Sequence, residues 1–193
     1  MIDEANGPNE PDMPRVRNKR LEMNNELLTL KRNAVLLGLC DRYKTEWNEA
    51  KDKKDLVDMA LDANGVEFMA KSVAEGWGLS KDYILDNFGD YVNGSYVRDK
   101  GGYTSEIYVG YGGDILQRAT LNLLVGCDTS VLVPEGSMCK IYVCGMSDVR
   151  IKCVGKCYVY VYGGYNDVKY SGDVTVEEIA KPDEPNKMIK IWQ

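Results

Sequence analysis

Glycines recur at nearly constant intervals along the last third of this chain. They lie at Gly126, Gly136, Gly145, Gly155, Gly164 and Gly172, which are 10, 9, 10, 9 and 8 residues apart. Short runs of alternating apolar and polar residues separate them. A fixed interval of this kind is typical of a repeat architecture in which each unit is one short strand and one turn.

The parity of the residues within these runs predicts which side of each strand faces inward, because successive side chains on a strand point to opposite faces. One face collects small apolar residues: Val131, Val133, Cys139, Ile141, Val143, Val149, Ile151, Cys153, Cys157, Val159, Val161, Val168, Val174 and Val176. This composition predicts a narrow, dry interior, in which the cysteines act as small apolar side chains.

Two architectures fit the repeat. The first is a small β-solenoid in which two strand repeats make most of one rung. The second is an antiparallel meander or sandwich, which favours two-residue Asn-Gly or Asp-Gly hairpin turns. Residues 126–176 contain neither dipeptide, so the solenoid is favoured. The apolar segment 188–192 is expected to cover an open end of the solenoid, because an exposed strand edge invites pairing with another chain.

The front of the chain has a helical period instead. From Lys19 to about Lys51, apolar residues recur three, four and seven apart at Leu21, Leu27, Leu28, Leu30, Ala34, Val35, Leu37 and Leu39. Shorter helices are expected over residues 53–63, 66–75 and 80–88, with Asn64-Gly65 as a stop between the first two. The sequence predicts an α+β chain with a flexible acidic tail (1–16), a helical domain (17–93) and a β-repeat domain (94–193).

Composition excludes several kinds of chemistry. The chain has no histidine, so mechanisms that need an imidazole base are excluded. Four of its six cysteines, Cys139, Cys144, Cys153 and Cys157, have four, eight and three residues between one and the next, unlike the CxxC pairs of structural zinc sites. No phosphate-binding glycine motif and no catalytic carboxylate pair stands out. We expect no catalytic residue, no metal and no cofactor.

A partner surface is expected on the outward face of the repeats. It comprises Tyr142, Tyr158, Tyr160, Tyr162, Lys140, Arg150 and Lys152. Tyrosine and arginine are enriched where proteins bind one another, so protein partners are expected. Stacked tyrosines also suit a sugar, which leaves a carbohydrate-binding or glycan-cleaving module as an alternative. The net charge of −6 argues against nucleic acid, although six basic residues between 15 and 32 leave a local contact open.

The segment Val131–Ser137 followed by Ile141–Gly145 resembles the rungs of bactofilin-type β-helices. The whole organisation, a helical front and a short solenoid, resembles small structural proteins of tailed bacteriophages and prophages. That resemblance implies a non-enzymatic virion or assembly component that forms an oligomer and is made in the host cytoplasm.

Residues 1–14 contain three prolines and no apolar core, unlike a secretory signal. No apolar run reaches the roughly 18 residues of a membrane span.

Overall fold

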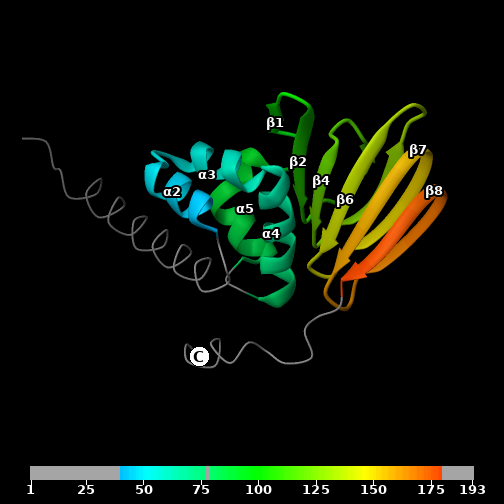
Figure 1. Cartoon of the computed structure of the whole chain (residues 1–193). Helices are drawn as coiled ribbons and strands as arrows, with labels where there is room; N and C mark the ends of the chain where they lie inside the picture. The colour runs from blue at the N-terminus through cyan, green and yellow to red at the C-terminus, as the bar shows by residue number, and fades with distance from the viewer. Residues whose placement is uncertain (1–39, 77–78, 180–193) are drawn as a thin grey trace, which may run out of the picture.

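The structure is a computed structural model that describes residues 40–76 and 79–179, with helices on one side and strands on the other (Figure 1). The helices are α2 (Asp41–Glu49), α3 (Lys53–Ala60), α4 (Ala63–Glu75), α5 (Lys81–Phe88) and the 3-10 turn η1 (Gly89–Tyr91). The strands are β1 (Val97–Lys100), β2 (Tyr103–Val109), β3 (Asp114–Leu116), β4 (Leu121–Val125), β5 (Asp128–Val133), β6 (Met138–Cys144), β7 (Asp148–Tyr162) and β8 (Asp167–Ile179). The acidic tail, the basic stretch 15–32 and the segment 188–192 lie outside the described residues.

The strands form a β-solenoid of about four turns. One sheet stacks β2, β4, β6 and the second halves of β7 and β8 in parallel, and the other stacks β3, β5 and the first halves of β7 and β8. Each rung pairs with the one about 16 to 20 residues later, as Ser105 pairs with Leu121 and Asp128 with Asp148. Among the described strands, only β1 and β2 pair antiparallel. The predicted solenoid is confirmed, and the antiparallel meander is wrong.

The interior of the solenoid is the predicted small apolar face. Val131, Val133, Cys139, Ile141, Val143, Val149, Ile151, Cys153, Cys157, Val159 and Val161 are all buried in one cluster, and Val168, Val174 and Val176 pack against it half-buried. Each inward residue pairs with the inward residue of the next rung, so apolar side chains stack on apolar side chains along the solenoid axis. The predicted inward residues therefore all belong to this core, which Tyr108, Ile115, Leu124 and Cys127 complete.

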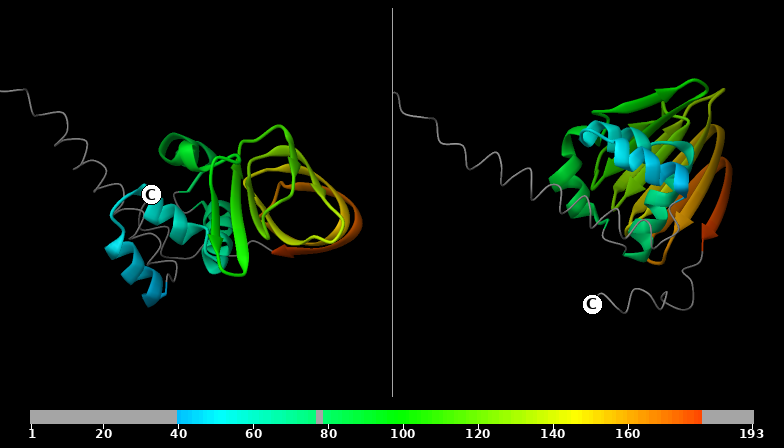
Figure 2. Two further views of the ribbon diagram at one scale, coloured as in Figure 1. Left: turned by 90° about the horizontal axis from the view of Figure 1, so that it is seen from above. Right: turned by 60° about the vertical axis from the view of Figure 1, so that its left-hand side comes forward.

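Strands β7 and β8 are longer than the repeat predicted, because each continues through its glycine and bends from one sheet into the other (Figure 2). Gly155 lies at the bend of β7. A Cβ atom there would come within 2.3 Å of the Ser137 carbonyl oxygen and 2.5 Å of that of Pro134. The neighbouring rung thus approaches so closely that only glycine fits, which is the physical reason for at least this member of the periodic series.

One predicted helix boundary is confirmed and another is wrong. Ser80 accepts a hydrogen bond from the Tyr83 amide at 3.1 Å and begins α5, as predicted. Asn64-Gly65 does not stop a helix, and both residues lie in the first turn of α4, which Asp62 caps. Glycine is needed at 65 because a Cβ atom would come within 2.3 Å of the Met59 carbonyl oxygen at the end of α3.

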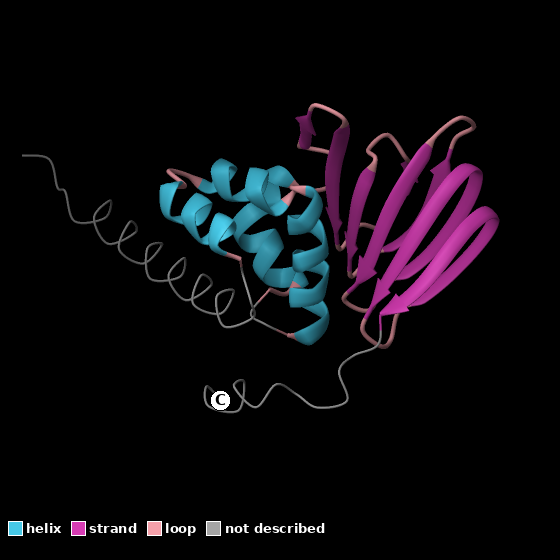
Figure 3. Cartoon of the chain, viewed as in Figure 1, coloured by secondary structure: helices cyan, strands magenta, loops and turns pink. Residues whose placement is uncertain are grey.

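The helices cover the outer face of the sheet that contains β2, β4 and β6 (Figure 3). Val66 and Ala70 of α4 and Ile84 of α5 are buried in the same cluster as Val109 of β2 and Val125 of β4. The solenoid sheet is therefore apolar on both faces. The helices complete their core against it, rather than only against one another as in a free-standing bundle.

Candidate functional site

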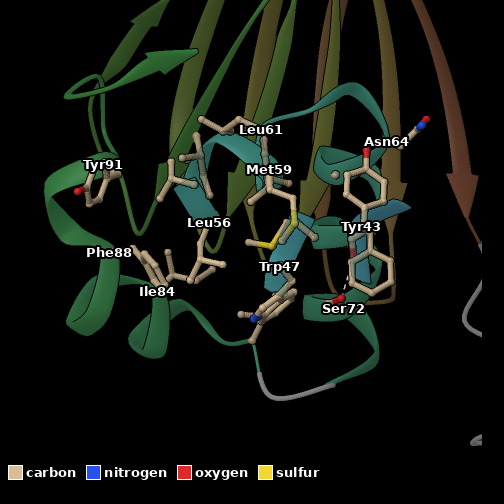
Figure 4. A pocket seen from close by; sticks show the side chains of 18 of the residues that line it. Tyr43, Trp47, Leu56, Met59, Leu61, Asn64, Ser72, Ile84, Phe88 and Tyr91 are labelled. Carbon is tan, nitrogen blue, oxygen red and sulfur yellow. Dashed lines mark hydrogen bonds between the residues drawn. The ribbon is translucent and has the colours of Figure 1, made fainter. Parts of the chain in front are cut away.

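An apolar groove lies within the helical half, with a volume of about 380 Å³. The side chains that define it here are Tyr43, Trp47, Leu56, Met59, Phe68 and Phe88, drawn in part in Figure 4. Ile107 and Leu123 of the solenoid sheet also line it. Leu56 is buried, whereas Trp47, Met59, Phe68 and Phe88 are half-buried around the groove. Large apolar side chains thus remain partly uncovered in the described structure.

Most polar groups beside the groove are engaged within the protein. The Ser72 hydroxyl donates to the Phe68 carbonyl oxygen at 2.8 Å. The Tyr43 phenol donates to the Asp62 carboxylate, and Asn64 points away from the other labelled side chains (Figure 4). Pockets for small polar ligands carry a few convergent polar groups that fix orientation. The groove is instead lined mainly by large apolar side chains.

The carboxylate of Asp62, which hydrogen-bonds the groove residue Tyr43, joins three elements. It accepts hydrogen bonds from Tyr43 of α2 and from Tyr103 of β2 at 3.1 Å, and Arg98 of β1 lies 3.4 Å away. Burial alone would raise the pKa of Asp62, but these donors and the Asn64 amide lower it to about 2. The group is therefore a charged anchor, with no proton to exchange near neutral pH.

The expected tyrosine surface is only partly exposed. Tyr142 and Tyr162 are buried, each 5% exposed, because they belong to the core shared with the helices. The prediction that these two rings are exposed on the outer face is therefore wrong, whereas partner binding by the other five residues stays a prediction. Tyr158 and Tyr160 are half-buried, and the Tyr160 ring stacks on that of Tyr142 with centroids 5.2 Å apart.

The basic members of the expected surface lie on different sheets. Lys140 is on β6, with its ammonium 5.9 Å from the Tyr160 ring centroid. Arg150 and Lys152 are exposed on the first half of β7, which belongs to the opposite sheet. Arg150 forms ion pairs with Asp148 at 3.1 Å and Asp128 at 3.4 Å. The seven residues do not form one patch, because β7 turns the corner between residues 153 and 157.

All six cysteines have free thiols, and only Cys40 is exposed. Cys139 and Cys157 occupy the same register on neighbouring rungs, with sulfurs 3.7 Å apart. Burial raises the pKa of the Cys144 and Cys127 thiols. Within residues 40–76 and 79–179, no cluster of three or more His, Cys, Asp or Glu side chains has the arrangement of a metal site.

Besides Asp62, a second carboxylate that the sequence pattern did not indicate is buried in the structure. Glu106 of β2 is 1% exposed and accepts from the Tyr108 phenol at 2.7 Å and from Arg118 at 2.8 Å. Its counterpart in the next rung is the buried polar residue Asn122, and its counterparts in the two rungs after that are the apolar residues Ile141 and Val159. The sequence did not indicate the groove either. Aromatic residues four apart on a helix, such as Tyr43 and Trp47, have the same spacing whether another segment covers them or leaves them exposed.

Comparisons with protein-family models, with curated proteins and with solved structures find no match. In the part of the chain that the structure describes, no helix is long and apolar enough to cross a membrane.

Proposed function

We propose that this protein is a non-enzymatic structural protein that assembles with further copies of itself through its helical half. The observation that carries the proposal is the apolar groove, whose rim residues Trp47, Met59, Phe68 and Phe88 are half-buried in the described chain. An amphipathic helix that lays its apolar face into a groove is a recurrent mode of protein recognition. The solenoid would serve as the rigid support for that site.

The occupant that fits is the amphipathic segment immediately before the described structure. Cys40, the first described residue, itself lines the groove. The preceding residues Leu27, Leu30, Ala34 and Leu37 are spaced three, four and three apart, so on a helix they form one apolar stripe. These side chains supply the apolar anchors that a groove of this kind takes.

A second stripe favours association between copies. Leu21, Leu28 and Val35 are seven apart, and at 3.6 residues per turn they lie about 140° around the helix from the first stripe. Lys31 falls between the two stripes. A helix that is apolar on two separate faces has to be covered from two sides, whereas one groove covers only one. We infer that the first stripe fills a groove and that the second packs against the segment of another copy.

Light scattering of the purified chain over a wide concentration range tests this proposal. The chain is expected to be an oligomer, and Leu28→Asp is expected to shift it to the monomer. Lys31→Ala, from between the stripes, is the matched control and should leave the mass unchanged. Trp47 reports on the groove, since Leu30→Asp should shift its fluorescence to longer wavelength as water enters. A Trp47→Phe variant identifies that signal among the three tryptophans.

A monomer at every concentration would overturn the proposal. If the Trp47 emission of that monomer still responds to Leu30→Asp, the segment fills the groove of its own chain instead. The role in a phage or prophage particle that the sequence resemblance implies is compatible with self-assembly and stays a prediction.

Glycan binding remains a second candidate with a smaller surface than the sequence suggested. Burial of Tyr142 and Tyr162 leaves Tyr158 and Tyr160 as the half-buried rings among the four tyrosines of the predicted surface. A glycan array whose hits disappear in the Tyr158→Ala and Tyr160→Ala variants would support it. An array without hits would remove it.

A further inference from the structure

The two ends of the solenoid differ in how their edges are protected. At the first rung, β1 pairs along the edge of β2, and the neighbouring edge strand β3 is only three residues long. At the last rung, β8 runs for 13 residues and pairs with β7 on one side. In the part of the chain that the structure describes, nothing pairs with its other side. Long bare edges are sites of uncontrolled pairing, so natural proteins cover them.

The interior is also open at that end. Val168, Val174 and Val176 belong to the solenoid core but are only half-buried, and Tyr170 is 55% exposed. In the previous rung the inward residues Val149, Ile151 and Cys153 are all buried. The difference arises because no further rung covers β8 among the described residues.

We propose that residues 186–192 of the same chain form the next rung and cap this edge. The rung interval supplies the register. Asp148 pairs with Asp167, 19 residues later, and the same step places residue 186 beside Asp167. Ile189 then lies over Tyr170 and Ile191 over Gly172, both at inward positions. Lys190, between them, points outward, as Lys152 does two rungs earlier.

The local sequence agrees with that register and not with its neighbour. Ile189-Lys190-Ile191 repeats the apolar, basic, apolar pattern of Ile151-Lys152-Cys153. A step of 20 residues, as between Asp128 and Asp148, would instead turn Lys190 into the interior, where an unpaired charge is costly. In the favoured register the remaining inward position is Lys187, at the start of the strand, where its ammonium can reach water.

The connection is also long enough. Residues 163–166 carry the chain from β7 on the first sheet to β8 on the second, and residues 145–147 do the same between β6 and β7. Residues 180–185 provide six residues for the corresponding step after Ile179. They include Pro182 and Pro185, which cannot donate to a strand ladder and suit a connecting segment.

Amide hydrogen exchange measured by NMR on the full chain tests the cap. A strand at 186–192 covers β8 only over residues 167–173, so residues 174–179 form an internal control. The amides of 167–173 that do not bond to β7 are expected to exchange about tenfold or more slowly than those of 174–179 that face the same way. Equal, fast exchange in the two stretches would overturn the proposal.

Paired substitutions test the register. Ile189→Asp and Ile191→Asp place charges inward and should abolish the protection, whereas Lys190→Ser should leave it unchanged. The reverse sensitivity would overturn the proposed register. Protection that is lost on dilution would mean that a second copy covers the edge, which would overturn an intramolecular cap. None of these outcomes depends on the groove, so the cap and the self-assembly proposal can fail separately.

Discussion

Tyr43 of α2 donates its phenol hydrogen to the carboxylate of Asp62, the residue that caps α4. The same carboxylate accepts from Tyr103 of β2 and lies 3.4 Å from Arg98 of β1. One buried charge thus holds the first described helix, the longest of the described helices and the edge of the solenoid together. Because its partners come from three elements, its loss is expected to affect the whole fold.

Lowering the pH should reduce the free energy of unfolding, because it protonates Asp62. The folded-state pKa is about 2 against an ordinary value of 3.8, so the charged carboxylate stabilises the fold by about 2 kcal/mol. That contribution is present above about pH 4 and is lost as pH falls toward about 2. Asp62→Asn should therefore lower the free energy of unfolding at neutral pH, with a difference from wild type that narrows below about pH 4. Denaturant unfolding across pH measures this.

The exposed Asp86 supplies the control for that experiment, since Asp86→Asn should leave the pH profile unchanged. A gap between wild type and Asp62→Asn that stays constant down to about pH 2 would contradict the assigned role of the charge.

The corner at Gly155 should not tolerate a side chain. Gly155→Ala places a Cβ atom 2.3 Å from the Ser137 carbonyl oxygen, and forcing the two rungs apart is expected to cost about 2 kcal/mol or more. Gly164→Ala is the matched control, because no atom lies within 4 Å of its Cβ position, and its effect should stay within about 0.5 kcal/mol. Thermal or denaturant unfolding of the two variants distinguishes them. Equal stability would mean that the rungs are not packed this closely.

Tyr142 should behave as a core residue. It is 5% exposed beneath the helices, so Tyr142→Ala is expected to cost about 3 kcal/mol or more of unfolding free energy. Tyr158→Ala, in the same sheet but half-buried, should cost clearly less. Denaturant unfolding of both variants measures the difference. Similar small losses would place Tyr142 on an open face, as the sequence alone suggested.

Thiol reactivity should separate Cys40 from the other five cysteines. Cys40 is exposed, whereas Cys127, Cys139, Cys144, Cys153 and Cys157 are buried. Titration of the native protein with an aromatic disulfide reagent is expected to show one fast thiol, which Cys40→Ser removes. The remaining thiols should react only as the protein unfolds. A second fast thiol in the native state would contradict the dry solenoid interior.

The helical half shows where sequence reasoning stops. The start of α5 at Ser80 was predicted correctly, because an N-cap depends only on one side chain and the amides within one turn. Asn64-Gly65 looked like a stop by the same local logic, yet Gly65 serves the contact between α3 and α4. A glycine that permits a close approach cannot be told from one that ends a helix without knowing what approaches it.

What the sequence determined by itself is the β-solenoid and its interior. The side-chain period of two and the glycine interval are local properties, and stacking equivalent rungs repeats them along one axis, so Val149, Ile151 and Cys153 could be placed inward from parity alone. Only the tertiary structure decided which outward-facing side chains are buried and which of them lie together. Tyr142 became core because α4 packs over it, Arg150 separated from Lys140 because β7 turns a corner, and Trp47 came to line a groove. Burial of an outward side chain depends on which distant segment covers it, and no local pattern carries that information.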